Sequence, residues 1–107
     1  WTAGLQLALD VIGLRPGDEV ITSVYTFPAT AAAILHLQAR PVLVDVQPDT
    51  LTIDPAEVER KITERTRALI PVHLAGCPCA NEHTAKDKVI ASIKRLAFMP
   101  ASVKMAT

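Results

Sequence analysis

The sequence lacks several features that would mark out whole classes of protein. It has no net charge, since eleven basic residues balance eleven acidic ones, so no field favours nucleic acid or an anionic membrane. It has no membrane-length apolar run and no basic leader ahead of the apolar residues 5–14, so we predict neither a span nor a signal peptide. Its only cysteines, Cys77 and Cys79, stand one residue apart, which disfavours a secreted disulfide scaffold and indicates a reducing cytoplasm.

Glycine is also scarce, with four residues in the chain. The pair Gly13 and Gly17 is not a dinucleotide-binding fingerprint, which needs three glycines between a strand and a helix. At 107 residues the chain can bury one modest core, so we expect a single domain at most. Composition changes near residue 80: residues 1–79 hold six basic and nine acidic residues, whereas residues 80–107 hold five and two.

What is present is an alternation of helical and strand-like patterns. Leu5, Leu9 and Ile12 recur at helical spacing, and Thr2 stands where a capping hydroxyl belongs. The apolar and turn patterns predict helices at 2–13, 26–38 and 54–62 and buried strands at 19–22, 41–46 and 68–72. This alternation predicts an α/β fold, a mainly parallel sheet of three strands with flanking helices.

The region 80–107 gives a separate signal. Val89, Ile90 and Ile93 share one helical face with basic residues around it, so residues 84–97 could form a basic amphipathic helix. Beyond Met99 we predict no fixed structure.

A metal site is one interpretation of the residues around the two cysteines. His73, Cys77, Cys79 and His83 could in principle surround zinc. The Cys-x-Cys spacing is tighter than in usual zinc sites, and Pro78 stiffens the turn between the thiols. The simpler interpretation is two reduced cysteines in a loop, and we predict no metal site.

Several short motifs occur in a characteristic order, and together they carry more information than any one of them. These are Thr2-Ala3-Gly4, Gly17-Asp18-Glu19-Val20-Ile21, Tyr25-Thr26-Phe27-Pro28-Ala29-Thr30, Val44-Asp45-Val46 and Pro71-Val72-His73-Leu74-Ala75-Gly76. Over residues 2–79 the series resembles the large-domain core of the DegT/DnrJ/EryC1/StrS aminotransferases. The resemblance implies pyridoxal 5'-phosphate (PLP) as cofactor and amination of nucleotide-linked keto-sugars, as in amino-sugar and polysaccharide biosynthesis.

The resemblance also implies roles for individual residues. Thr2 and Ala3 match the phosphate-binding residues of the family, and Phe27 matches the aromatic residue that stacks on the pyridine ring. From the residues alone, Thr2 would be an ordinary helix cap and Phe27 a core aromatic. His73 follows the third strand at the edge where open α/β sheets bind ligands, although a structural histidine fits equally well. Asp45 is interpreted as structural, bonding nearby backbone N–H groups.

The matching motifs end before the residues that catalysis requires. Transamination needs a Schiff-base lysine and a carboxylate on the pyridine nitrogen, and in the family both follow the Pro-Val-His segment. We find neither here, so we predict no catalytic residue and expect an incomplete enzyme, inactive alone, with a partial PLP-binding large domain at 1–79 and a divergent tail at 80–107. Gln38 also stands where the family usually has a glycine.

The expected partners follow from the same resemblance. A complete enzyme would use a nucleotide-linked keto-sugar and glutamate, would form a homodimer, and would bind neither nucleic acid nor membrane. Two other interpretations stay open: a small phosphate-binding or PLP-binding module that docks on a partner through the basic helix, and a truncated product without function.

Overall fold

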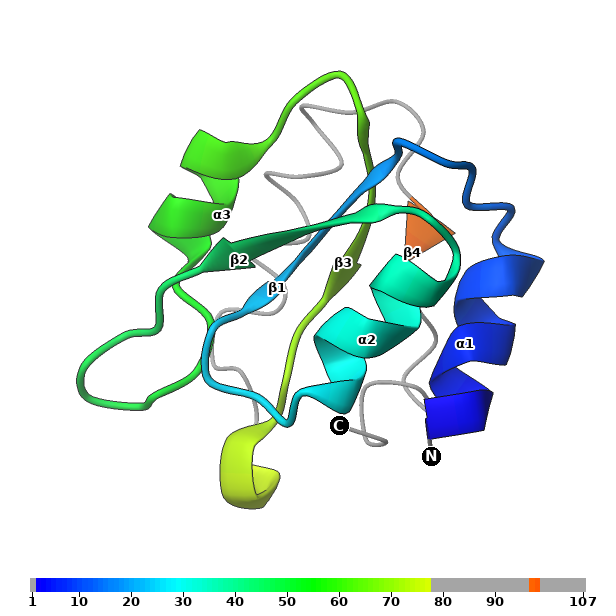
Figure 1. Ribbon diagram of the computed structural model, residues 1–107. Helices are drawn as coiled ribbons and strands as arrows, with labels where there is room; N and C mark the ends of the chain where they lie inside the picture. The colour runs from blue at the N-terminus through cyan, green and yellow to red at the C-terminus, as the bar shows by residue number, and fades with distance from the viewer. Residues whose placement is uncertain (1, 78–96, 99–107) are drawn as a thin grey trace.

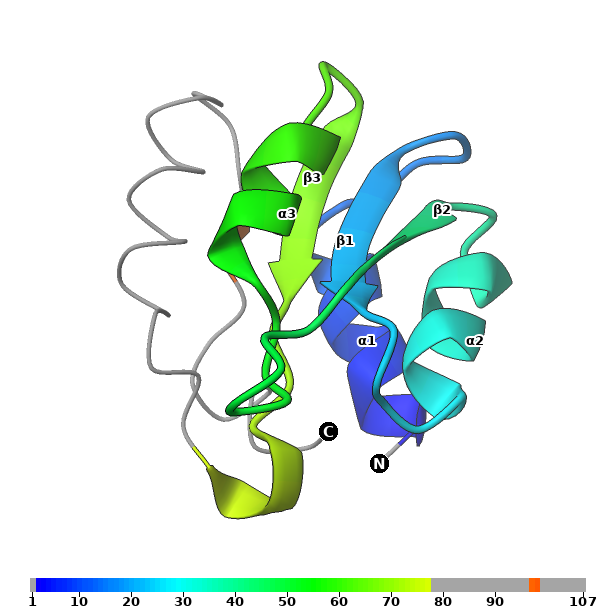
Figure 2. The ribbon, with the colours of Figure 1, turned by 90° about the vertical axis from the view of Figure 1, so that its left-hand side faces the viewer.

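The chain forms a parallel β-sheet with helices on both faces (Figures 1 and 2). The computed structural model describes residues 2–77 and 97–98. In chain order the elements are α1 (Thr2–Val11), β1 (Glu19–Ser23), α2 (Ala29–His36), β2 (Arg40–Val44), α3 (Pro55–Lys61), β3 (Thr66–Ile70), the 3-10 turn η1 (Leu74–Gly76) and β4 (Ala97–Phe98). The expected α/β fold with a parallel sheet and flanking helices is confirmed.

The sheet has the strand order β2-β1-β3-β4, and every neighbouring pair is parallel. All five residues of β1 are buried because this strand lies inside the sheet with helices over both faces. The sequence predicts three strands, whereas the structure adds β4, which pairs with Ala68 and Leu69 of β3. β2 stays at the edge, where Pro41 is tolerated although it has no N–H to donate.

Two hydrophobic clusters hold the layers together. Helices α1 and α2 cover one face of the sheet, and their cluster contains Leu5, Leu9 and Ile34 with Val20 and Ile70 of the strands. Helix α3 covers the other face, where Val58 belongs to a second cluster. Alternate residues of each strand therefore serve different helices. This doubly covered arrangement explains the continuous apolar runs in the sequence.

The helix boundaries follow from local chemistry. Asp54 Oδ1 accepts a hydrogen bond of 2.9 Å from the Ala56 backbone N–H, with Pro55 in the first turn, as the capping motif predicts. Helix α2 is shorter than the expected 26–38, because Thr26 and Phe27 lie in the loop before it. Thr2 was expected to cap α1 from the position before the helix, but it is the first residue of the helix itself.

The third strand is displaced from its expected range, 68–72, toward the amino end. It begins at Thr66, whose hydroxyl accepts from the Thr63 N–H at 3.0 Å, and it ends at Ile70. Pro71 cannot continue the ladder as a donor. The shift leaves Pro71 and Val72 as a buried lead into His73.

The predicted helix at 84–97 falls outside the described residues except for its last position. That residue, Ala97, lies in β4 and not in a helix, because its backbone pairs with Ala68 at the side of β3 away from β1. The expectation for the residues beyond Met99 also falls outside the described ranges.

Gln38 lies in the left-handed region, with φ 59°, one residue beyond Leu37, which caps the end of α2. Its N–H donates to the Leu35 carbonyl at 2.9 Å, and its carbonyl accepts from Gly17 at 3.1 Å, so the turn is held at both ends. A side chain in this conformation costs about 1 kcal/mol relative to glycine. Gln38→Gly should therefore raise the free energy of unfolding by up to about 1 kcal/mol in urea titrations.

A matched control is Gln47→Gly, at a residue that does not have a positive φ. Glycine at that position adds backbone freedom to the unfolded chain without relieving strain, so the variant should lose stability. A loss of stability in both variants would contradict the strain assigned to Gln38.

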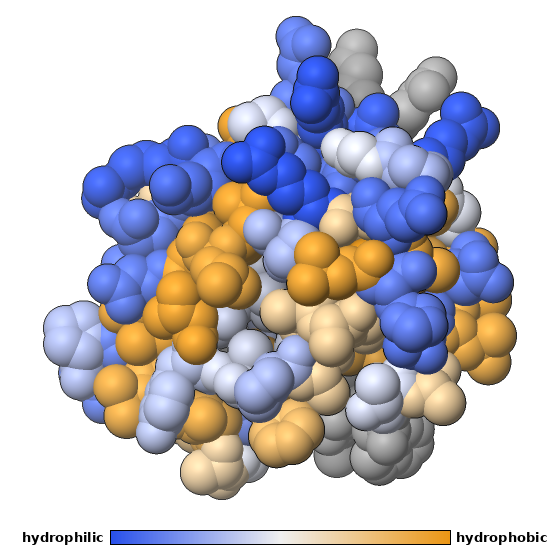
Figure 3. Space-filling model, in the orientation of Figure 1, coloured by the Kyte–Doolittle hydropathy of each residue, from blue (hydrophilic) through white to orange (hydrophobic). Residues whose placement is uncertain are grey.

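Large apolar side chains remain on the outer surface (Figure 3). Among the described residues they are Leu7, Val11, Val24, Tyr25, Phe27, Leu35, Leu43 and Leu51. Together with the edge strand β2, they form apolar faces and an unpaired edge of the kind that further protein covers. No helix within the described part of the chain has the length and apolar character to cross a membrane.

Candidate functional site

The carboxyl ends of the strands meet the first turns of α1 and α2 at one edge of the molecule. Figures 1 and 2 place the amino end of α1 and the amino end of α2 side by side at this edge, with η1 leaving β3 at the same end of the sheet. Because the helices run antiparallel to the strands, their N-terminal ends meet the strands' carboxyl ends. Ligands of open α/β sheets bind at this edge.

The first turn of α1 is open to solvent. Thr2, Ala3 and Gly4 are exposed, while Leu5 and Leu9 fix the helix to the sheet. The first N–H groups of a helix have no partner within it, and the helix dipole places partial positive charge there. No acidic side chain occupies this turn. The end of α1 is therefore suited to a phosphate group.

Phe27 lies in the loop between β1 and α2, at the same edge. It is 76% exposed, so the interpretation of Phe27 as a core aromatic is wrong. A flat aromatic face open to solvent is suited to stacking on a flat heterocycle. The structure thus brings a candidate anion site, at the first turn of α1, and a candidate stacking surface, in the loop before α2, to one edge of the sheet.

His73 and Asp45 follow strands β3 and β2 at this edge. His73 caps η1, and its carbonyl accepts from the Gly76 N–H at 3.1 Å in a turn where Ala75 has φ 51°. Asp45 Oδ1 accepts from the Val46 N–H at 2.8 Å, and the Asp45 carbonyl accepts from Asp54 at 3.1 Å. The structural role expected for Asp45 is confirmed.

The zinc interpretation gains no support from the described residues. Within residues 2–77 and 97–98, no three His, Cys, Asp or Glu side chains are grouped to hold a metal ion. Cys77 is exposed, whereas Cys79 and His83 lie outside the described residues.

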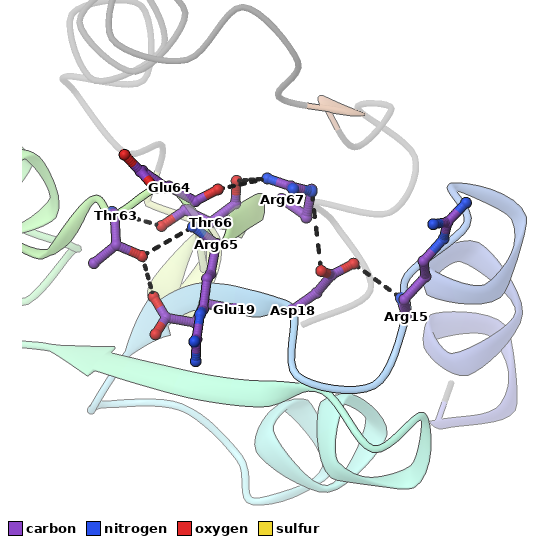
Figure 4. Close-up of polar contacts among 8 residues, drawn as sticks. All are labelled: Arg15, Asp18, Glu19, Thr63, Glu64, Arg65, Thr66 and Arg67. Atoms are coloured by element: carbon purple, nitrogen blue, oxygen red, sulfur yellow. Dashed lines mark hydrogen bonds and ion pairs between the residues drawn. The ribbon is translucent and has the colours of Figure 1, made fainter.

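The opposite edge carries a polar network that the sequence did not reveal (Figure 4). Glu19 is 7% exposed, and its Oε2 accepts from the Thr63 hydroxyl at 2.7 Å across 44 residues of sequence. Arg67 Nε lies 3.9 Å from Asp18 Oδ1, and its Nη1 donates to the Glu64 carbonyl at 2.8 Å. These bonds tie the starts of β1 and β3 together, so this edge is structural. No local pattern announces contacts between residues so distant in sequence.

The comparison with protein families decides the identity. The model of the DegT/DnrJ/EryC1/StrS aminotransferase family matches residues 1–95, which is most of the chain. The chain belongs to this family. The match passes residue 79, where the resemblance seen in the sequence ends, and so includes part of the basic region. DegT/DnrJ/EryC1/StrS enzymes are the sugar aminotransferases to which the ordered motifs pointed.

Individual aminotransferases agree with this assignment. A protein of Streptoalloteichus tenebrarius, named as an L-glutamine:3-amino-2,3-dideoxy-scyllo-inosose aminotransferase, is 58% identical over 75 residues, 70% of this chain and 18% of its own length. DesV of S. venezuelae, solved with a ketimine intermediate, superposes with TM-score 0.81 at 41% identity, covering 91% of this chain and 25% of DesV. NtdA of Bacillus subtilis, solved with pyridoxamine phosphate (PMP), gives TM-score 0.79 at 35% identity, with 91% of this chain and 22% of NtdA covered.

The chain thus spans about a fifth of the length of the relatives that it matches. The matched residues 1–95 contain Thr2, Ala3 and Phe27, the residues at the candidate site. The sequence analysis did not find one contact close to Phe27 in the chain. The hydroxyl oxygens of Thr26 and Thr30 lie 3.0 Å apart. In the sequence, the only sign of this contact is the spacing of the two threonines, four residues apart.

Proposed function

We propose that this chain supplies the phosphate-binding helix and the ring-stacking face of a PLP site in a sugar aminotransferase. The observation that carries the proposal is that the exposed first turn of α1 and the loop with the exposed Phe27, directly before α2, lie at the same edge of the sheet. Both groups fit PLP chemically: the helix end suits its dianionic phosphate, and the aromatic face suits its pyridine ring. Family membership and the PMP bound to NtdA support this choice of ligand.

When bound, PLP supplies the electron sink that amino-group transfer requires. The residues of this chain would bind the cofactor and orient it. N–H groups of Thr2 and Ala3 would hold the phosphate at the end of α1, while Phe27 would cover one ring face and exclude water from it. The buried Leu5 and Leu9 fix α1 on the sheet, so the phosphate site has a rigid base.

The proposed reaction is transfer of an amino group to a nucleotide-linked keto-sugar. The ketimine intermediate in DesV supports amination of a carbonyl carbon by this fold. Glutamate is the proposed amino donor. Glutamine should be tested beside glutamate, because the name of the Streptoalloteichus relative contains L-glutamine. The complete enzyme would act as a homodimer.

The isolated chain should bind without turning over substrate. Among the described residues the one lysine is Lys61, the last residue of α3. Helix α3 runs toward the amino ends of the strands, so Lys61 lies at the edge opposite Phe27 (Figure 1). The lysines at 86, 88, 94 and 104 lie outside the described residues and stand in sequence contexts unlike the family's lysine loop, so we expect glutamate or glutamine to support no amination by this chain.

Phe27→Ala should weaken binding of PMP to the purified chain about tenfold, because stacking and the water-excluding ring contribute roughly 1 to 1.5 kcal/mol. PMP is the better probe than PLP because it has no aldehyde to react with lysines. Isothermal titration calorimetry measures the dissociation constant directly.

Leu35→Ala is the matched control. Leu35 is an apolar side chain on α2, 59% exposed, near the helix end remote from the site, so its loss should leave PMP affinity unchanged. Pyridoxamine without phosphate should bind at least tenfold more weakly than PMP, because the end of α1 recognises the anion. Equal affinity of the parent chain and Phe27→Ala for PMP would refute the stacking role.

A further inference from the structure

The loop that carries Phe27 is fastened at every position. The Val24 N–H donates to the Val44 carbonyl at 2.9 Å, which ties the start of the loop to β2. The Tyr25 N–H donates to Ser23 Oγ at 3.1 Å, and Ser23 is 1% exposed. At the far end, the Pro28 carbonyl accepts from Ala32 at 3.0 Å inside the first turn of α2. An exposed aromatic ring therefore stands on an ordered backbone.

Thr26 and Phe27 are both bonded to one residue of α2, Thr30. The hydroxyl of Thr30 lies 3.0 Å from the hydroxyl of Thr26, directly before Phe27 in the chain. The backbone N–H of Thr30 donates to the Phe27 carbonyl at 3.1 Å. Thr30 is 1% exposed. If its hydroxyl were removed, water could not take the place of that hydroxyl as the partner of Thr26 without disturbing the packing.

We infer that Thr30 is a positioning residue that orients the Phe27 ring through its hydroxyl contact with Thr26. Thr26 and Thr30 bracket Phe27, and their contact joins the loop to the rigid first turn of α2. A buried threonine hydroxyl in the first turn of a helix could instead bond its own backbone. In this chain it reaches across to the loop and fixes the ring before any ligand arrives. The inference rests on the proposed function only where cofactor affinity is concerned.

The test compares three variants of the full 107-residue chain. Thr30→Val keeps the shape and removes the hydroxyl, whereas Thr30→Ser keeps the hydroxyl. Thr52→Val is the matched control, because Thr52 is 2% exposed and its hydroxyl lies 2.8 Å from that of Thr50, in the loop between β2 and α3 and away from Phe27 in the sequence. Each valine variant removes one part-buried contact between two hydroxyl groups, so both should lower the melting temperature to a similar extent.

The first readout needs no ligand. NMR scalar couplings of Phe27 report its χ1 distribution, which should be one dominant rotamer in the parent chain and an average of rotamers in Thr30→Val. Thr30→Ser and Thr52→Val should keep the parent couplings. Unchanged couplings in Thr30→Val would overturn the inference whether or not the chain binds a cofactor.

The second readout is PMP affinity by calorimetry. Thr30→Val should bind PMP about fivefold more weakly, the size expected for loss of one hydrogen bond, and Thr30→Ser should restore the affinity. Averaged couplings with no PMP binding by any chain would uphold the positioning role and refute the proposed function. Parent affinity in Thr30→Val together with weakened binding in Phe27→Ala would overturn the inference and leave the proposed function standing.

Discussion

Leu9→Ala should lower the free energy of unfolding by about 3 kcal/mol, within the range of 2 to 5 kcal/mol measured for buried leucines. Leu9 is fully buried in the cluster between α1, α2 and the sheet, so alanine leaves a cavity that the strands cannot close. Urea titration followed by far-ultraviolet circular dichroism measures the change. For a small domain this is a large share of the total stability.

Leu7→Ala provides a control on the same helix with the same change of residue. Leu7 is 64% exposed, so its replacement should alter stability by no more than about 0.5 kcal/mol. Since α1 carries the proposed phosphate site, Leu9→Ala should also weaken PMP binding, and Leu7→Ala should not. Equal stability of the two variants would mean that α1 does not pack on the sheet through Leu9, and the phosphate site would lose its base.

The order of elements could be predicted because each layer leaves a local signature. Strands covered on both faces are apolar without alternation, as in Ala68 to Ile70, and the amphipathic helix α1 repeats its buried leucines four residues apart. Asp54 with Pro55 marks a helix start by chemistry within one turn. Such signals depend only on neighbours in sequence.

The errors lie where structure depends on distant residues. The residues Thr26 and Phe27 look like a helix start, yet the loop must first cross the edge of the sheet and bond to β2 through Val24. Strand β4 is defined by its pairing with β3, which is far away in the sequence. A strand of two residues is too short to be predicted from its own pattern. The bond from Thr63 to Glu19 is equally invisible before the register of β1 and β3 is known.

The candidate site shows the same division. Thr2, Ala3 and Phe27 could be assigned because an ordered series of motifs matched a family, and the match with residues 1–95 confirms that family. Their proposed roles still need the ligand experiments above. The contact between the hydroxyls of Thr26 and Thr30 came only from the structure, because it depends on the path of the loop between them.

Borohydride reduction of the chain in the presence of PLP should label no single lysine stoichiometrically. The lysine that a complete aminotransferase uses must reach the aldehyde carbon of PLP, the cofactor that we propose would be held by the end of α1 and the Phe27 ring. Lys61 is exposed at the opposite edge of the sheet. The lysines at 86, 88, 94 and 104 occur in sequence contexts unlike the family's lysine loop, and we expect no selective reaction there.

Peptide mapping by mass spectrometry separates the possible results. Exposed lysines react slowly and without selection, so the expected map is a low, even level of modification that competing PMP does not reduce. Lys61→Arg should leave that map otherwise unchanged, because the side chain keeps its charge and its place at the end of α3. A complete adduct on one lysine, suppressed by PMP, would show a catalytic amine on this polypeptide. The chain would then have to be regarded as able to start the reaction alone, and the interpretation of it as a binding part of the site would be wrong.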